Sequence, residues 1–273
     1  MEKFFVFAAA AALTATATLS QAATVINLDF GPTDVTGSTT LAPYQAISGD
    51  STNVTWNALL GTADKGAGTL KFGNNTTATN VTYNLGVTSA TSSDSLLATQ
   101  PSDSSALGTT YNTGIYANNS PAKDAIFDRN GGSNNRGIAM QVGGLTAGTW
   151  DIYYVGRNTS LDVSKSASPQ LYIETLRAAA SSSSGDFSFG SYASDAITYN
   201  LANTQTANWI DGGTYAKLSV TLTTGQYLNL AFTGSDVEKR GFLNALQIVS
   251  APEPSAAWLL GSGVVLLARR RRK

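Results

Sequence analysis

Cysteine and histidine are both absent from this chain of 273 residues. Without cysteine there is no disulfide and no thiol nucleophile, so a secreted fold must depend on packing alone. Without histidine the chain cannot form a Ser-His-Asp triad, a His-ligated zinc site or a histidine general base. Among the common hydrolytic mechanisms, these absences leave open only catalysis by a pair of carboxylates.

Charge is also scarce, since only 13% of the residues are charged while 42% are hydrophobic, which is sufficient for a core. Residues 1–3 and 269–273 contain six of the 17 basic residues and one of the 18 acidic residues. The chain between them therefore keeps 11 basic and 17 acidic residues, a net charge of −6. An acidic chain has no electrostatic footprint for nucleic acid, so we expect no such partner.

The N-terminus has the three parts of a secretion signal. Lys3 supplies the positive start, and the residues from Phe4 to Leu13 form an apolar stretch. Small residues follow at two alternative cleavage positions, in Ser20-Gln21-Ala22 and in Gln21-Ala22-Ala23. We predict that residues 1–23 are a signal peptide and that the secretion machinery exports the chain; a buried N-terminal helix is the alternative.

The C-terminus combines a proline motif, an apolar run and a basic end. Pro252-Glu253-Pro254-Ser255 precedes the 13 apolar or small residues 256–268, and Arg269, Arg270, Arg271, Arg272 and Lys273 follow. As a helix the run spans about 20 Å, short of a hydrocarbon core of about 30 Å, although arginine stems extend its apolar reach. The basic end is expected in the cytoplasm, with Pro252 to Pro254 on the far side of the membrane.

These ordered features closely resemble the PEP-CTERM sorting tail of Gram-negative bacteria, over about the last two dozen residues. The resemblance implies that exosortase, a membrane cysteine protease, recognises Pro252, Glu253 and Pro254 and removes the tail. It also implies a setting in bacteria that produce exopolysaccharide. An unrelated tail anchor is the alternative. The expected product resides in the cell envelope or outside the cell.

The residues between the two ends alternate in the period of strands. Apolar residues alternate with polar or small ones in 81–87, 138–142, 150–154, 171–173, 197–201, 216–222, 228–232 and 242–248. Thr223-Thr224-Gly225-Gln226 is interpreted as the turn of a hairpin, and residues 176–180 could form one helical turn. We predict an all-β antiparallel β-sandwich, with a jelly roll preferred, at residues 24–250, followed by the sorting tail at 251–273.

Two segments carry a second resemblance. The segment at 144–154 is similar to a turn followed by a strand in jelly-roll carbohydrate-binding modules, and the segment at 241–249 is similar to their last strand. The preferred function is an exported, non-catalytic envelope or matrix protein, with an extracellular polysaccharide as a candidate partner. The alternative is a secreted polysaccharide-active enzyme that uses a carboxylate pair. Glu174 and Glu238 are the only glutamates of the middle domain and form no evident cluster, so an enzyme is disfavoured.

Three tryptophans, at positions 56, 150 and 209, offer rings on which a sugar could stack. Trp150 shares a strand face with Ile152 and Tyr154, so we expect it in the core. Trp209 and Trp56 are the candidate glycan contacts, with packing at the end of the sandwich as the alternative for Trp209.

One loop is rich in oxygen ligands. Asp124, Asp128 and Asn130 lie in a Gly- and Asn-rich segment and are candidate calcium ligands, since calcium takes six to eight oxygens. Their spacing does not match the EF-hand pattern, and a solvated Asx turn is the preferred interpretation. No other cofactor is expected.

Overall fold

The computed structural model describes residues 22–31, 42–59, 68–87, 102–104, 115, 121, 124–127, 137–156, 172–184, 197–201, 208–234 and 241–251. Grouped by their contacts, the residues from Ala23 to Ala251 form one compact unit, and the segments Met1–Ala22 and Pro252–Lys273 are separate from it. These limits lie next to the domain boundaries expected from the sequence. Residues 1–21 and the whole predicted sorting tail from Pro252 onward lie outside the described residues.

Sheet A contains five strands in the spatial order β10-β7-β13-β1-β2. Neighbouring strands run antiparallel except for β1 and β2, which are parallel. The strands are β1 (Val25–Phe30), β2 (Trp56–Leu59), β7 (Gly148–Val155), β10 (Ala216–Leu222) and β13 (Ala245–Ser250).

Sheet B also contains five strands, in the order β3-β6-β11-β8-β9, and every neighbouring pair is antiparallel. A smaller sheet has the strand order β12-β5-β4, and its strand β12 contacts β11 of sheet B. The strands of sheet B are β3 (Thr82–Val87), β6 (Ile138–Gly143), β8 (Tyr172–Ser181), β9 (Ile197–Leu201) and β11 (Tyr227–Gly234), and those of the small sheet are β4 (Ser102–Ser104), β5 (Ala125–Phe127) and β12 (Phe242–Leu243).

The main core lies between the facing surfaces of sheets A and B. Every second residue of β1, β6, β7, β11 and β13 points into it, as the pleat requires. Sheet A supplies Ile26, Leu28, Phe30, Trp150, Ile152, Tyr154, Leu246 and Ile248, and sheet B supplies Tyr83, Leu85, Ile138, Met140, Val142, Leu228, Leu230 and Phe232. The fold is therefore mostly β, with two antiparallel-rich sheets packed together, and the expectation that Trp150 belongs to the core is confirmed.

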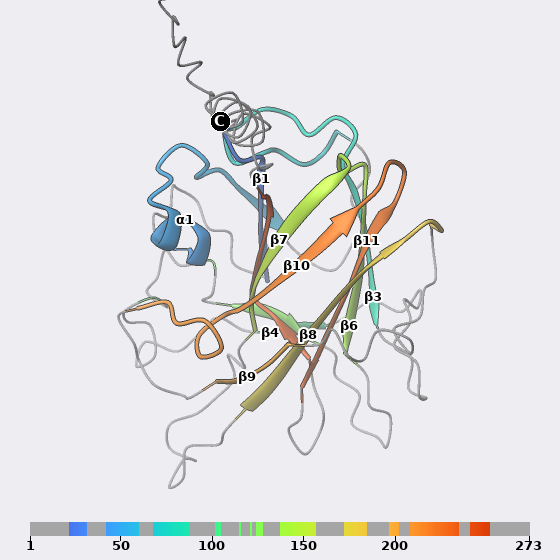
Figure 1. Ribbon diagram of the computed structural model, residues 1–273. Coiled ribbons are helices and arrows are strands. Elements are labelled where there is room, and N and C mark those ends of the chain that lie inside the picture. The colour runs from blue at the N-terminus through green and yellow to red at the C-terminus, as the bar shows by residue number, and fades with distance from the viewer. Residues whose placement is uncertain are drawn as a thin grey trace, which may run out of the picture. The chain divides into compact units, whose positions relative to one another are not determined.

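Two tight turns carry the chain from one sheet to the other at the same end of the unit (Figure 1). The first joins β6 of sheet B to β7 of sheet A and begins at Gly144, whose φ is +74°. A side chain there would meet the carbonyl oxygen of Asn80 at 1.8 Å, so only glycine fits.

The second turn, at Thr223–Gln226, joins β10 of sheet A to β11 of sheet B. Gln226 N–H donates to the carbonyl of Thr223, at 3.1 Å, and Gly225 has a φ of +80°. The predicted turn is present, but the predicted hairpin is wrong, because the strands on either side pair with β7 and with β6 and β8 rather than with each other. The apolar residues of β10 and of β11 both point into the main core. Two strands in facing sheets therefore show the same apolar alternation as two strands of a hairpin.

The two ends of the compact unit lie side by side. β1 pairs antiparallel with β13, with Val25 opposite Val249. Thr24 N–H donates to Ser250 Oγ at 2.7 Å, and Ser250 N–H donates to the carbonyl of Thr24 at 2.8 Å. The last described residue, Ala251, donates its N–H to the carbonyl of Thr149 at the start of β7. Both ends therefore lie at the end of the unit that carries the β6–β7 turn.

One short helix, α1 (Pro43–Ser48), lies in the connection between β1 and β2. Proline occupies its first turn, and Gly49 closes it in the left-handed conformation with a φ of 70°. Residues 176–180, interpreted as a single helical turn, instead belong to β8, so that interpretation is wrong. Within the described ranges, no helix has the length and apolar character needed to span a membrane.

Candidate functional site

The outer face of sheet A, which points away from the main core, is also largely buried. The strand register places one residue from each strand in a single row across this face. From edge to edge the row contains Trp56, Asn27, Gln247, Tyr153 and Lys217. Asn27 and Gln247 have almost no solvent exposure, so their amides need partners from the elements that cover the face.

Those partners come from α1 and the segment after it, and form an amide network of Asn27, Gln45 and Gln247. Gln247 Nε2 donates to Asn27 Oδ1 at 2.8 Å and to Gln45 Oε1 at 2.6 Å, while its Oε1 accepts from Tyr44 N–H at 2.9 Å. Asn27 Nδ2 and Gln45 Nε2 both donate to the carbonyl of Asn53, at 3.0 and 2.6 Å. The three side chains thus attach α1 to the middle of sheet A by fixed hydrogen bonds.

Beside this network lies an aromatic cluster of Tyr44, Tyr153, Trp209 and Tyr215. The Tyr153 ring is 5.8 Å from that of Tyr44 and 6.0 Å from that of Tyr215, measured between centroids. Trp209 meets Tyr215 edge-on, at 6.5 Å and 73°. Tyr153 and Tyr215 are buried, whereas Tyr44 and Trp209 remain partly exposed at the margin. The rings therefore hold one another and present an aromatic margin to solvent.

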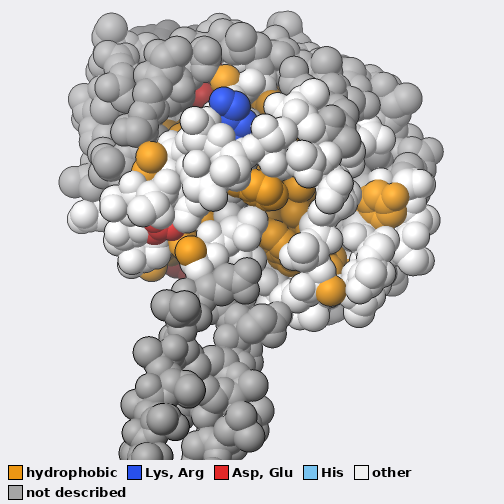
Figure 2. All heavy atoms as spheres, turned by 90° about the horizontal axis from the view of Figure 1, so that it is seen from above, with side chains coloured by type: hydrophobic (Ala, Val, Ile, Leu, Met, Phe, Trp, Pro, Cys, Tyr) orange, Lys and Arg blue, Asp and Glu red, His pale blue; other side chains and the backbone are white. Residues whose placement is uncertain are grey.

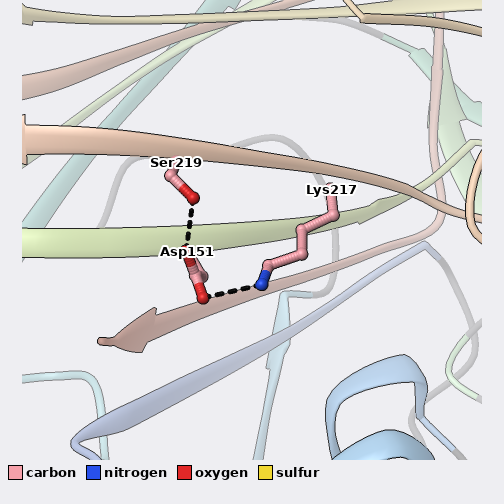
Figure 3. A network of polar contacts seen from close by, with 3 residues as sticks. All are labelled: Asp151, Lys217 and Ser219. Atoms are coloured by element: carbon pink, nitrogen blue, oxygen red, sulfur yellow. Dashed lines mark hydrogen bonds and ion pairs between the residues drawn. The ribbon is translucent and has the colours of Figure 1, made fainter. Parts of the chain in front are cut away.

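A polar triad of Asp151, Lys217 and Ser219 lies next to the aromatic cluster, on β7 and β10 (Figure 3). Lys217 Nζ lies 2.9 Å from Asp151 Oδ2, and Ser219 Oγ donates to the other oxygen of the same carboxylate. Lys217 Nζ also lies 5.3 Å from the centroid of the Tyr153 ring, a cation–π distance. The side chains of Lys217 and Asp151 are 35% and 18% exposed, and Ser219 is exposed, so the triad faces solvent.

The titration of these groups limits their chemistry. Burial alone would lower the pKa of Lys217, but the hydrogen bond and charge of Asp151 raise it above its ordinary value. Burial raises the pKa of Tyr153, and the nearby charge of Lys217 offsets part of that increase. Lys217 is therefore a cation and Tyr153 a neutral phenol near neutral pH. A protonated lysine cannot accept the proton of Ser219, so the triad suits hydrogen bonding to a ligand better than nucleophilic attack.

The two tryptophans predicted as glycan contacts lie on the same face but are not brought together. Trp56 is on the edge strand β2, while Trp209 packs against Tyr215 near the opposite edge strand β10. Four strand spacings separate those edges, about 19 Å. Trp56 and Trp209 both pack, partly buried, against the apolar cluster of this face. Of these two tryptophans, Trp209 belongs to the aromatic cluster.

Asp124, the first candidate calcium ligand, is fully buried beside Gly31 and does not lie in a solvated turn. A side chain at Gly31 would approach the Asp124 carboxyl carbon to 2.5 Å, and the Asp124 carbonyl accepts from Asn244 Nδ2 at 2.6 Å. The solvated Asx turn is therefore wrong for this residue. Asp128 and Asn130 lie outside the described residues, and a calcium site stays a prediction. In the described part of the chain, no group of three or more carboxylates gathers as a metal site would require.

The carboxylates considered for catalysis gain no further support. Glu174 lies on β8, opposite Gly234 of β11, and Glu238 lies outside the described residues. Pro252, Glu253, Pro254 and the four terminal arginines also lie outside them.

The sequence interpretation missed Tyr44, Tyr153, Tyr215, Asp151, Lys217 and Ser219. The signal was available on the second face of two predicted strands. In β7, Asp151, Tyr153 and Val155 alternate with the core residues, and in β10 Lys217 and Ser219 do the same. The sequence could not predict that these residues lie close together, because their proximity depends on the pairing of β7 with β10 and on the register that places Lys217 opposite Tyr153.

The chain was compared with protein families, curated proteins and solved structures. No family model and no curated protein matches it. Among solved structures it is similar to the protein YxiM of Bacillus subtilis, at 13% identity and a TM-score of 0.33. The match covers 84% of this chain and 40% of the YxiM chain. So distant a likeness assigns neither a family nor a function.

Proposed function

We propose that this protein is an exported, non-catalytic component of the cell envelope or extracellular matrix, processed by exosortase, whose β-sandwich binds carbohydrate. One observation carries the proposal. The compact unit begins at Ala23 and ends at Ala251, next to the predicted signal cleavage positions and directly before the Pro252-Glu253-Pro254 motif. A domain that ends at both processing sites is what an exported and trimmed protein requires.

The hydrogen bonds at these ends support removal of both segments. The first and last strands of the unit pair with each other, and the final bond from Ala251 to Thr149 precedes Pro252. All the named strands lie between Val25 and Ser250. Cutting before Ala23 and beyond Pro254 therefore leaves every described strand pair intact, and proline at 252 and 254 favours an extended, accessible motif.

The strand order supports a jelly roll as the finer description of the domain. Along the chain, β6 lies in sheet B, β7 in sheet A, β8 and β9 in sheet B, β10 in sheet A, β11 in sheet B and β13 in sheet A. Repeated crossing between two facing sheets distinguishes a jelly roll from a meander of hairpins. The carbohydrate-binding modules that the sequence resembles have this architecture.

The described surface at the end of the unit where Ala251 lies is weakly charged. Figure 2 looks onto the end that lies at the top of Figure 1, and its described atoms show hydrophobic side chains gathered among uncharged ones, with few basic or acidic groups. The turns that face this end, Gly144–Ala147 and Thr223–Gln226, contain no charged residue. Such a surface tolerates proximity to a membrane during export, because it requires little desolvation of charge.

Intact-mass measurement on protein recovered from the producing bacterium tests this proposal. We expect the wild-type protein to lack both the N-terminal segment and the arginine cluster. Glu253→Gln should retain the arginine cluster, and Glu238→Gln, a matched change elsewhere, should be processed normally. Replacing Arg269 to Arg272 by neutral residues should impair both retention and cleavage, since the positive end fixes the orientation. Wild-type protein that keeps its arginines beside an active exosortase contradicts the proposal.

A further inference from the structure

We infer that the outer face of sheet A binds a neutral polysaccharide, along the margin formed by Trp209, Tyr44 and the polar triad of Asp151, Lys217 and Ser219. The inference rests on the proposed function and names the binding surface and the ligand class within it. Three features of the described residues carry it: partly exposed rings, exposed polar groups in fixed positions, and the balance of charge around them.

The rings of Trp209 and Tyr44 are held in fixed orientations and offer apolar contact to a ligand. Trp209 is held edge-on against Tyr215, and Tyr44 is held against Tyr153, while both Trp209 and Tyr44 remain partly exposed. Ile210, beside Trp209, is 55% exposed and adds apolar surface at the same margin. The C–H face of a sugar ring is apolar and its rim is hydroxylated, so a partly exposed ring beside polar groups matches it.

The triad supplies donors and acceptors that are already oriented. Asp151 accepts from both Lys217 and Ser219, which fixes all three side chains before a ligand arrives. Lys217 has three ammonium protons and Ser219 has two lone pairs, so each retains hydrogen-bonding capacity for sugar hydroxyls. Because the groups are fixed in advance, binding a ligand costs little further side-chain entropy.

Charge favours a neutral polysaccharide over an anionic one. Among the described residues, the cation beside the rings is Lys217, which is matched by Asp151 at 2.9 Å. Asp50 and Asp211 also face the cluster, since Asp50 accepts from Tyr44 OH at 3.2 Å and the Asp211 charge acts on Tyr153 and Tyr215. The described groups around the rings therefore sum to a negative charge, which repels uronic acids.

The tyrosines do not change this balance near neutral pH. Burial raises the pKa of Tyr44 and of Tyr215 above the ordinary value, and the charges of Asp50 and Asp211 raise it further. With Lys217 a cation and the phenols neutral, the charge of the surface is constant from about pH 6 to pH 9. Binding should therefore be constant over that range.

Affinity electrophoresis of the protein recovered from the producing cells provides the test. Gels contain laminarin, xylan or galactomannan as neutral polymers, and alginate or polygalacturonate as acidic ones. We expect retardation by at least one neutral polymer and by neither acidic one. Trp209→Ala and Ser219→Ala should each weaken it by about tenfold, as truncation of a central contact does. Ile210→Ala, adjacent to the margin, should weaken it less, and Thr224→Ala, in the exposed β10–β11 turn, should leave it unchanged.

Ser219→Ala alters an exposed side chain and Lys217→Gln one that is 35% exposed, so their thermal midpoints should stay near that of the wild type and their binding data remain interpretable. Three results overturn the inference: retardation by no polymer, retardation only by the acidic polymers, or binding by Trp209→Ala and Ser219→Ala equal to that of the wild type. Intact mass, measured on the same samples, reports on processing independently. A correctly trimmed protein that binds nothing therefore contradicts the binding surface and leaves the export proposal standing.

Discussion

The two faces of sheet A are both largely buried, but they are built in different ways. Along β1 the inner face is apolar, with Ile26, Leu28 and Phe30 packed against sheet B. The outer face of the same strand contains Val25, Asn27 and Asp29, which are equally inaccessible to solvent. Burial on the inner face requires only apolar surface, whereas burial on the outer face requires a partner for each polar atom.

This difference has consequences for specificity. Apolar contacts have no direction, so the inner face accepts many sequences of similar volume. The outer face is specified by hydrogen bonds between residues far apart in the chain, such as Gln247 with Gln45 and with Asn27. Fully satisfied amides of this kind rigidify the elements that they join. The aromatic cluster therefore rests on a support that holds α1 in one position on the sheet.

The largest effect is expected from truncation of the inner face. Phe30→Ala removes a fully buried ring from the main core and should lower the free energy of unfolding by about 3–5 kcal/mol. Urea denaturation followed by tryptophan fluorescence measures the change. Ile210→Ala, which truncates a side chain that is 55% exposed, is the control and should cost under about 0.5 kcal/mol. A loss from Phe30→Ala no larger than that of its control would show that sheets A and B do not share this core.

A smaller loss is expected from the amide network. Gln247→Ala leaves Tyr44 N–H, Gln45 Oε1 and Asn27 Oδ1 without the bonds that Gln247 makes. Unsatisfied buried groups cost about 1–3 kcal/mol, so the same denaturation assay should give a loss in that range.

Gln226→Ala is the matched control for this substitution. It removes one bond to Thr223 N–H in an exposed turn and should cost clearly less. If Gln247→Ala and Gln226→Ala are equal, water replaces the network and α1 is not held by it. In that case the two faces of sheet A would differ in residue composition, but the hydrogen bonds of the outer face would add no stability.

The sequence predicted the inner face better than the outer one. Alternation in residues 81–87, 138–142 and 216–222 located β3, β6 and β10, because one apolar face is enough to define a strand. It did not show which strands are neighbours. Thr223–Gln226 was therefore interpreted as a hairpin turn, although the turn joins two sheets.

Local competition between signals explains the other errors. Residues 176–180 contain Leu176, Arg177 and three alanines, which favour a helix, but pairing of β8 with both β11 and β9 overrides that propensity. The helix α1 was not predicted although Pro43 and Gly49 mark its two ends, because six residues carry too little periodicity. β1 was likewise missed, although Ile26, Leu28 and Phe30 alternate with Asn27 and Asp29 as in a strand with one apolar face.

The candidate site was predicted only in part. Trp209 was identified from its residue type, but Tyr44 reaches the same cluster from α1, and Tyr153 and Lys217 come from β7 and β10. Such a cluster depends on strand order and on the docking of α1, which are tertiary features. Trp56 shows the opposite error, since it was predicted from its residue type but lies at the far edge of the sheet.

The smallest effect is expected from Asp50, at the rim of the outer face, and it concerns pH. Burial alone would raise the pKa of this carboxyl, but hydrogen bonds from the Asn53 side chain, from Thr52 and from the backbone of Asn53 lower it from 3.8 to about 2. Asp50 Oδ1 accepts from Thr52 N–H and from Thr52 Oγ1, both at 2.8 Å, and Oδ2 accepts from Asn53 Nδ2 at 2.7 Å. Since the pKa is lower in the folded state, the ionised carboxylate stabilises the fold above about pH 4. That stabilisation is lost as the pH falls from about 4 to 2.

Asp50→Asn therefore sharpens the comparison of the two faces, because it weakens the rim and leaves the inner face unchanged. The thermal midpoint of the variant should lie below that of the wild type at pH 6, and the gap should close as the pH falls to 2. Thr52→Val removes one donor to the carboxylate but keeps the backbone N–H, so its gap should be smaller, and it too should close as the pH falls to 2. Other carboxylates titrate in both proteins and cancel in the difference. A gap that stays constant or widens toward pH 2 would mean that the hydrogen bonds around Asp50 do not favour its ionised form, and that α1 is held to sheet A by the amide network alone.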